Sequence, residues 1–259
     1  MSALDDLFAR TRAENRAALV GYLPAGFPDK HTSIAAIEAM IEGGVDLVEV
    51  GLPYSDPVMD GPVIQAAAEK ALAAGTRIGD VFDVVRASAA GAPTVVMTYW
   101  NPVERYGVDR FAGDLAAAGG AGLITPDLVP DEADEWLKAS ESHGLDRVFL
   151  VAPSSTDDRI AYTADAASGF IYATAVMGVT GARESTSSAA PALVERIRAK
   201  SGKPVGVGLG VSNGAQAAEV AAYADAVIVG SALVRALGDG GVEAVRNLAQ
   251  ELRAGVQRR

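Results

Sequence analysis

The sequence predicts a TIM (β/α)₈ barrel, and three observations point to it. The chain has 259 residues, close to the ~250 that one such barrel takes. Eight short runs of apolar, often β-branched residues alternate with alanine-rich helical stretches. The starts of these runs recur at roughly 30 residues, the length of one strand–helix unit. We therefore expect a single (β/α)₈-barrel domain over residues 1–259.

The predicted strands are continuously apolar, which is typical of parallel strands that helices cover. An open, doubly wound sheet has the same alternation of strands and helices, but the strand count and the chain length favour the barrel. In chain order the predicted strands are Ala18–Leu23, Asp46–Val50, Thr94–Thr98, Gly122–Ile124, Val148–Val151, Phe170–Ala173, Val205–Gly208 and Ala226–Val229.

Two helices are expected in addition to the eight repeating units. A leading helix around Leu4, Leu7 and Phe8 precedes the first strand, where it can plug the bottom of the barrel. A second extra helix opens at Gly61-Pro62, after the second strand and before the helix over Asp80–Ala89. The predicted fold is thus a barrel with extra helices at the N-terminus and after strand 2.

Composition narrows the classes of function. Apolar residues make up 49% of the chain and charged residues 21%, enough to bury a core. The net charge of −11 disfavours nucleic acid and anionic lipid as partners. The absence of cysteine excludes disulfides, thiolate nucleophiles and thiolate-bound metals. No apolar run reaches ~18 residues, and the acidic N-terminus does not resemble a signal peptide, so we expect a cytoplasmic protein.

Glu49 is the strongest candidate for catalysis, because it is an acid at the end of an otherwise apolar strand. Active sites of this fold lie at the carboxyl ends of the strands. If Val45 and Leu47 point into the barrel, Glu49 does too, since alternate residues share a face. Burial would then raise its pKa toward the range useful for proton transfer. A structural role for Glu49, paired with arginine or capping a helix, stays open at this point.

The loop after Glu49 carries a second acid, Asp60, just before the extra helix. Folding of this loop can bring both carboxylates to one mouth of the barrel. The alternative for Asp60 is a helix cap, and for Asp56 a turn before Pro57. Prolines at Pro53 and Pro57 restrict this loop, which lowers the entropy lost on docking a partner.

Glycine-rich segments follow the last three strands. The loops after the seventh and eighth strands usually form the phosphate site of this fold, because backbone N–H groups approach phosphate oxygens closely there. Glycines at both ends of the segment 178–181 suit a hinged lid, with Thr180 placed to donate a hydrogen bond to Asp60. The candidate phosphate ligands are Gly208, Gly210, Gly230 and Ser231, and the family resemblance described below adds Gly181.

The predicted strand ends carry no lysine and no histidine, which argues against Schiff-base and metal-dependent mechanisms. A Schiff-base mechanism needs a lysine inside the barrel, and all five lysines fall in helices or in loops that enter strands. The two histidines, His31 and His143, lie on or beside helices and far apart, so no metal site is expected. Chemistry here must run on carboxylates, hydroxyls and backbone groups.

The segment 47–62, Leu-Val-Glu-Val-Gly-Leu-Pro-Tyr-Ser-Asp-Pro-Val-Met-Asp-Gly-Pro, closely resembles the signature of the tryptophan synthase alpha chain family. The resemblance continues in order over nearly the whole chain, through 126–128, 178–182, 206–212 and 229–232. The first of these motifs is very specific, whereas the glycine motifs alone would not be.

This resemblance implies retro-aldol cleavage of indole-3-glycerol phosphate to indole and glyceraldehyde 3-phosphate. It implies catalysis by Glu49 and Asp60, and a substrate pocket with Tyr22, Tyr99 and Tyr172. It also implies an alpha2beta2 heterotetramer in which a beta chain receives the indole, with Pro53, Asp56 and Pro57 at the interface. Pyridoxal phosphate is expected only in that beta chain, and no cofactor in this one.

Two departures from the family pattern and two rival functions remain. Many members carry polar residues where this chain has Val176-Met177, and threonine in place of Pro24. Both could alter loop motion or pocket shape. One rival is another phosphate-binding barrel enzyme, such as a sugar-phosphate isomerase. The other is a non-catalytic chain that only activates a partner, against which the intact Glu49 and Asp60 argue.

Overall fold

The strands form one parallel sheet that closes into a barrel. The computed structural model describes residues 1–174, 189–208 and 210–257. The strand order is β5-β4-β3-β2-β1-β9-β8-β7-β6, and the two ends of this order, β5 and β6, are separated only by Phe149. The strands are β1 (Ala18–Pro24), β2 (Leu47–Gly51), β3 (Thr94–Met97), β4 (Gly122–Ile124), β5 (Asp146–Val148), β6 (Leu150–Val151), β7 (Ile171–Thr174), β8 (Val205–Gly208) and β9 (Ala226–Val229).

Closure decides against the open, doubly wound sheet and confirms the predicted barrel. The predicted strand over Val148–Val151 corresponds to β5 and β6, which break at Phe149. The break does not open the barrel, because the Tyr172 backbone N–H donates to the Phe149 carbonyl at 3.1 Å. The other predicted strands match within one residue at each end.

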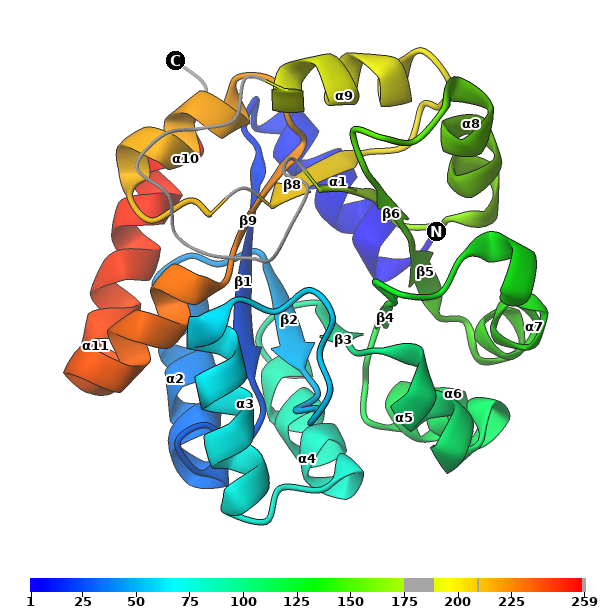
Figure 1. Cartoon of the computed structure of the whole chain (residues 1–259). Coiled ribbons are helices and arrows are strands. Elements are labelled where there is room, and N and C mark those ends of the chain that lie inside the picture. The colour runs from blue at the N-terminus through cyan, green and yellow to red at the C-terminus, as the bar shows by residue number, and fades with distance from the viewer. Residues whose placement is uncertain (175–188, 209, 258–259) are drawn as a thin grey trace.

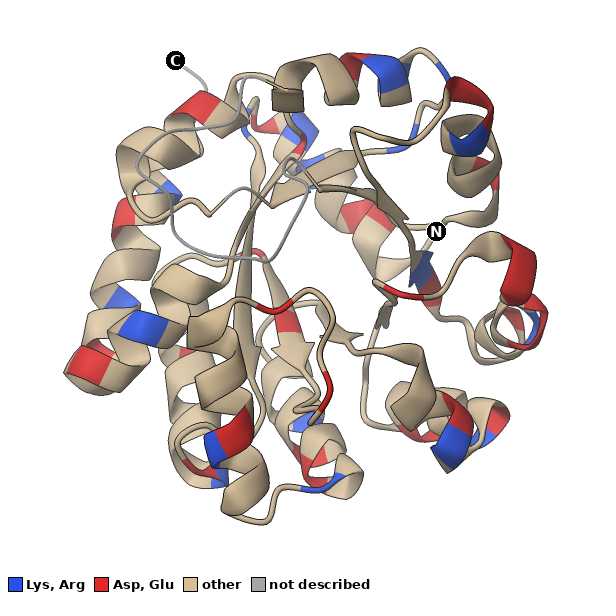
Figure 2. Ribbon diagram, in the orientation of Figure 1, with Lys and Arg blue, Asp and Glu red and all other residues tan. Residues whose placement is uncertain are grey.

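Helices surround the barrel, and charged residues concentrate on them (Figures 1 and 2). Among the described helices, none is long and apolar enough to cross a membrane. The outer helices are α2 (Lys30–Glu42), α3 (Pro62–Ala73), α4 (Ile78–Ala89), α5 (Trp100–Tyr106), α6 (Val108–Ala117), α7 (Asp134–His143), α8 (Asp157–Ala166), α9 (Ala189–Arg198), α10 (Gly214–Ala221) and α11 (Ser231–Gly255), with a 3₁₀ turn, η1 (Pro130–Glu132).

Both expected extra helices are present. The leading helix α1 (Ala3–Ala13) starts at a capping box, in which the Ser2 hydroxyl accepts from the Asp5 N–H and the Asp5 carboxylate accepts from the Ser2 N–H. The helix after β2 is α3, with Pro62 at its first position, where the missing N–H costs nothing. Two helices, α5 and α6, follow β3, so one helix here is a third addition, which the sequence did not lead us to expect.

The barrel interior is filled by alternate residues of the strands and by α1, which plugs the bottom as expected. Every second strand residue points inward, and one face of α1 packs against this layer, with the Phe8 and Phe170 rings 5.7 Å apart. The inner cluster comprises Leu4, Leu7, Phe8, Ala18, Val20, Leu47, Val95, Ile124, Val148, Phe170, Ala226 and Ile228. Because this layer fills the lower barrel, a substrate can enter only from the carboxyl ends of the strands.

A buried ion pair ties the segment between α1 and β1 to the amino end of β2. Arg16 donates two hydrogen bonds to the Asp46 carboxylate, at 2.6 and 2.8 Å. The same carboxylate accepts from the Leu19 backbone N–H at 2.9 Å. Asp46, predicted as a strand residue, therefore acts just before β2 as an anchor, and it fixes the strand that carries Glu49.

Candidate active site at the carboxyl end of the barrel

Glu49 lies inside the upper barrel, 1% exposed. It follows Leu47 of the inner cluster by two positions, so the alternation of β2 turns its side chain inward. Val45, which precedes β2, does not belong to this inner cluster but to the larger core cluster of the protein. The Glu49 Oε2 atom is buried and has no hydrogen-bond partner among the described residues, so pairing with arginine or capping a helix does not explain this acid.

Asp60 lies at the mouth of the same barrel, 9% exposed. It does not cap α3, whose N-cap residue is Gly61. Its carboxylate instead accepts a hydrogen bond from the Tyr99 hydroxyl at 3.0 Å. Its backbone carbonyl accepts from the Gln65 side-chain amide at 2.7 Å. These contacts fix the residue at both its backbone and its side chain.

The surroundings of the two carboxyl groups separate their protonation. Burial, and next the charge of Asp60, raise the pKa of Glu49 to about 8. Burial also raises the pKa of Asp60, but the hydrogen bond from Tyr99 opposes that rise. Around neutral pH Glu49 is therefore an acid with a proton to give, whereas the hydrogen bond from Tyr99 favours the ionised form of Asp60.

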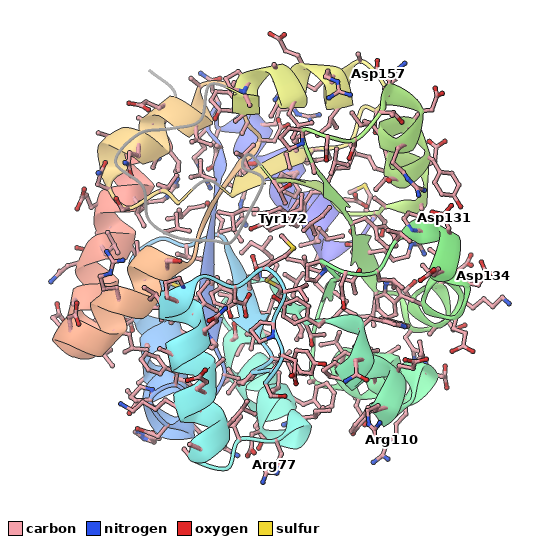
Figure 3. The ribbon with its side chains drawn as sticks, in the orientation of Figure 1. Arg77, Arg110, Asp131, Asp134, Asp157 and Tyr172 are labelled. Carbon is pink, nitrogen blue, oxygen red and sulfur yellow. The ribbon has the colours of Figure 1, made fainter. Side chains whose placement is uncertain are left out.

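Two further predicted pocket residues, Tyr22 and Tyr172, line the space around these acids. Tyr22 pairs in register with Glu49 across β1 and β2. Tyr172 lies near the centre of the barrel, whereas the labelled charged residues lie on the periphery of the molecule (Figure 3). A Cβ atom on Gly208 would lie 2.5 Å from the Tyr172 hydroxyl oxygen, so only glycine leaves room for this ring. Burial raises the pKa of both phenols far above its usual value, so both stay neutral.

Four of the predicted phosphate ligands lie at the carboxyl ends of β8 and β9. Gly208 ends β8, and Gly210 follows with φ +70°, a conformation that favours glycine. Gly230 is the N-cap residue of α11, and Ser231 is its first residue. The first N–H groups of a helix have no intrahelical partner and attract anions. Thr180, Gly181 and the rest of the predicted lid lie outside the described residues.

The predicted docking loop between β2 and α3 is exposed only in part. Pro53 is buried and Pro57 half-buried, whereas Asp56 is exposed. Val58, which the sequence reading did not single out, is 69% exposed. The Asp56 carboxylate accepts a hydrogen bond from the neighbouring Ser55 hydroxyl at 2.5 Å, so the loop presents an acid and an apolar side chain together.

Three residues that the sequence reading did not assign hold these loops together. Tyr54 stacks on Tyr99, with ring centroids 5.5 Å apart. The Asn101 side-chain amide donates to the Tyr54 hydroxyl at 3.0 Å. The Asp127 carboxylate accepts from the Trp100 backbone N–H at 2.9 and 3.1 Å. The available sequence signal was a charged residue close to the end of a strand, since Asp127 lies three residues after the last residue of β4.

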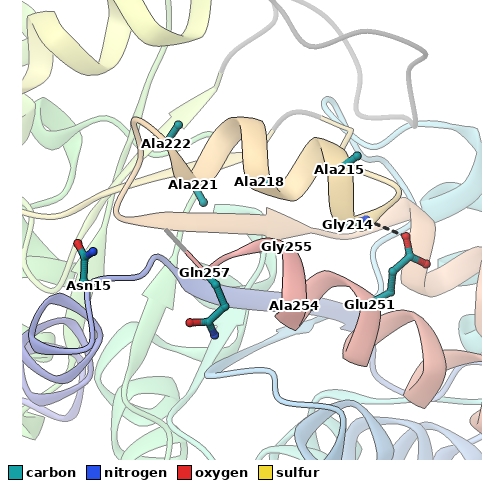
Figure 4. A pocket seen from close by; sticks show the side chains of 10 residues that line it. All are labelled: Asn15, Gly214, Ala215, Ala218, Ala221, Ala222, Glu251, Ala254, Gly255 and Gln257. Atoms are coloured by element: carbon teal, nitrogen blue, oxygen red, sulfur yellow. Dashed lines mark hydrogen bonds between the residues drawn. The ribbon is translucent and has the colours of Figure 1, made fainter. Parts of the chain in front are cut away.

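A groove of about 950 Å³ lies elsewhere, between α10 and the end of α11 (Figure 4). It shares no residue with the candidate site, and the Glu251 carboxylate at its edge accepts from the Gly214 backbone N–H at 2.8 Å. Within the described ranges, no group of three histidine, aspartate or glutamate side chains is arranged to hold a metal ion.

Comparison with known proteins identifies the family. The family model for the tryptophan synthase alpha chain matches residues 8–258. The chain belongs to the tryptophan synthase alpha chain family. The alpha chain of Nocardia farcinica is 66% identical, over 99% of this chain and 96% of that one. A solved structure of Mycobacterium tuberculosis tryptophan synthase superposes with TM-score 0.96 and 61% identity, covering 100% and 99% of the two chains.

More distant members of the family also share this fold, and membership of the family excludes one of the two rival functions. The tryptophan synthase alpha subunit of Legionella pneumophila superposes with TM-score 0.90 at 31% identity, covering 99% of this chain and 98% of that one. A sugar-phosphate isomerase is therefore excluded in favour of a tryptophan synthase alpha chain, a lyase. Of the two departures from the family pattern, Pro24 ends β1 beside Gly51 of β2, and Val176-Met177 lie outside the described residues.

The buried Glu49 carboxyl predicts a pH-dependent cost to stability. Its pKa is about 8 in the folded chain against an ordinary value of 4.5, so the folded state loses stability relative to the unfolded state as pH rises from about 4.5 to 8. Glu49→Gln removes this cost. Its melting temperature should equal that of the wild type near pH 4 and exceed it by at least ~2 °C at pH 8.

Scanning calorimetry across this pH range measures the difference. Glu38→Gln, on an exposed position of α2, is the matched control and should give a difference that does not grow with pH. A Glu49→Gln difference as flat as that of the control would mean that Glu49 is not buried as an acid.

Proposed function

We propose that this tryptophan synthase alpha chain cleaves indole-3-glycerol phosphate with Glu49 and Asp60 as its two catalytic groups. The single observation that carries the assignment is the pair itself: a buried carboxyl with a pKa of about 8 beside a second carboxylate held by a tyrosine hydroxyl. Two carboxyls in different surroundings can divide acid and charge-stabilising roles between them.

Glu49 carries out both proton transfers in this proposal. Protonated Glu49 first gives its proton to indole C3, which leaves an indoleninium cation and a Glu49 carboxylate. That carboxylate then takes the proton of the hydroxyl on the adjacent glycerol carbon. As this proton leaves, the carbon–carbon bond breaks, its electron pair restores the indole ring, and the aldehyde of glyceraldehyde 3-phosphate forms. Glu49 ends protonated, ready for the next turnover.

Asp60 stabilises the charge that the first step creates. Protonation at C3 places positive charge near the ring nitrogen, and an ionised Asp60 accepts a hydrogen bond from that N–H. The buried ring of Tyr22 and the partly buried ring of Tyr172 provide walls for the indole ring. Low polarity around the pair strengthens the attraction between the cation and Asp60.

Removing either carboxyl should therefore stop the reaction without unfolding the chain. Glu49→Gln and Asp60→Asn are each expected to lower kcat by at least ~100-fold, the typical effect of losing a general acid or a charge stabiliser. Indole release from indole-3-glycerol phosphate measures this, with and without a beta chain. Turnover at the wild-type rate in Glu49→Gln would refute the mechanism, and an inactive wild type would support the rival of a chain that only activates a partner.

The phosphate of the substrate binds, in this proposal, where β8 and β9 end. Gly210 adopts a positive φ, and the first turn of α11 begins at Ser231. Backbone N–H groups and a helix N-terminus suit a dianion even in an acidic chain, because they act locally. Gly208, Gly230 and Gly181 would complete this cradle, and we expect Thr180 to donate a hydrogen bond to Asp60.

Gly210→Asp is expected to raise KM at least ~10-fold, because it adds a side chain and a like charge at the phosphate position. Steady-state kinetics checks this. Gly202→Asp is the matched control, since it adds the same charge in open space at the other end of β8 and should leave KM unchanged. Equal KM values for the two variants would remove the site assignment.

The partner in this proposal is a pyridoxal phosphate-dependent beta chain, in an alpha2beta2 complex that receives indole directly. Indole is apolar and membrane-permeable, so direct transfer prevents its loss. The docking surface is assigned to Asp56, Pro57 and Val58, since the buried Pro53 offers a partner little area. A chain docked there touches the loop that positions Asp60, which gives a short route for mutual activation.

Asp56→Ala is expected to weaken binding of the cognate beta chain at least ~5-fold and to reduce the partner's stimulation. Basal cleavage by the isolated chain should remain. Titration calorimetry measures the affinity, and Asp239→Ala, an exposed acid in α11, controls for loss of charge. Undiminished affinity in Asp56→Ala, or the same loss in both variants, would argue against this docking surface.

A further inference from the structure

Tyr99 contacts the Asp60 carboxylate more directly than a wall of a substrate pocket would need to. We infer that Tyr99 is a positioning residue, whose hydroxyl orients the Asp60 carboxylate so that its second oxygen meets the ring N–H of the substrate. This inference rests on the proposed role of Asp60. It replaces the expectation that Tyr99 serves only as a substrate-pocket aromatic.

The direction of the hydrogen bond is fixed by a second contact to the same oxygen. The Met59 backbone N–H donates to the Tyr99 hydroxyl oxygen at 3.1 Å. A phenol has one proton to donate, and the Asp60 Oδ1 atom is 3.0 Å away. The Tyr99 hydroxyl therefore makes two hydrogen bonds to adjacent residues: it accepts from the Met59 backbone N–H and donates its own proton to the Asp60 carboxylate.

The tyrosine is itself held in place, as a positioning residue must be. Its side chain is 5% exposed, and the Tyr54 ring stacks against it at a 36° interplanar angle. Tyr99 is also the N-cap residue of α5. The helix start is anchored by Asp127, which accepts from the Trp100 backbone N–H. Three loops, after β2, β3 and β4, are thereby joined at Asp60.

The electrostatic consequence follows from the geometry. Hydrogen bonds to an ionised group are stronger than neutral ones. Burial raises the pKa of Asp60, and the Tyr99 hydroxyl limits that rise because it favours the ionised carboxylate. Without the hydroxyl, Asp60 would take up a proton at higher pH and so lose its charge. Its side chain would also be free to rotate away from the ring N–H of the substrate.

Tyr99→Phe tests this by removing the hydroxyl and keeping the ring. The expected result is a fall in kcat of about 10- to 100-fold, with KM within about 2-fold of the wild type because the wall of the pocket is intact. The acidic limb of the kcat–pH profile should move up by at least ~0.5 pH unit. A change in KM alone would mean that Tyr99 only forms a wall of the substrate pocket. An acidic limb at the same pH as in the wild type would overturn the inference.

Tyr106→Phe is the matched control. Tyr106, the last residue of the same helix α5, also donates to an aspartate, Asp114, at 2.6 Å. Its loss removes one tyrosine–aspartate hydrogen bond outside the candidate site and should leave kcat and the pH profile unchanged. Equal effects of the two variants would mean that Tyr99 acts through stability alone.

A double-mutant cycle separates this inference from the proposed function. If Tyr99 acts through Asp60, Tyr99→Phe should have no further effect on kcat in an Asp60→Asn background. Additive losses would overturn the inference while leaving the role of Asp60 intact. Wild-type turnover in Asp60→Asn alone would refute the proposed function, and the inference with it.

Asp127 offers a second handle should Tyr99→Phe fold poorly. Asp127→Ala removes the anchor of the Trp100 N–H and is expected to move the acidic limb in the same direction. Asp127→Asn keeps a side-chain oxygen that can accept from that N–H and should restore the wild-type profile. An Asp127→Ala profile identical to that of the wild type would contradict the positioning network.

Discussion

The burial of the Glu49 carboxyl group is the constraint on which the site depends. A charge in this position would be costly, and among the described residues no cation pairs with it. Desolvation together with the nearby Asp60 charge keeps the proton on Glu49 until a base is needed. The fold supports this environment, because the inner cluster and α1 close the barrel from below and the Arg16–Asp46 pair anchors the strand that carries Glu49.

The second acid is controlled by loops, not by the barrel. The Asp60 carboxylate accepts from a hydroxyl of the loop after β3, and its backbone carbonyl accepts from the Gln65 side-chain amide of α3. The two carboxyls thus have different kinds of support: Glu49 is positioned by its strand, and Asp60 by side-chain contacts between loops and a helix. In the proposed complex, a partner docked on the neighbouring loop would act on the position of Asp60 and not on that of Glu49.

The sequence alone predicts those features of the fold that depend on the spacing of apolar residues along the chain. Continuous apolar runs predicted the barrel, and the alternation along β2 placed Glu49 inside it. Contacts between residues that are far apart in the sequence could not be predicted. Tyr99 and Asp60 meet only because β2 and β3 are neighbours, and no local sequence pattern indicates this pairing. The extra helix after β3 was not predicted, because α5 spans only seven residues. The break at Phe149 leaves the apolar run of the fifth strand unchanged, so the sequence gives no sign of it.

The protonation state of Glu49 is the most direct test of this account. Carbon-13 NMR of chains labelled at the glutamate side-chain carboxyl, with Glu49→Gln to assign the resonance, follows its titration. The account predicts one glutamate carboxyl that stays protonated at neutral pH and titrates near the value of about 8, and that titrates lower in Asp60→Asn because the neighbouring charge is gone. A Glu49 resonance that titrates below about pH 5, like a solvated glutamate, would contradict it.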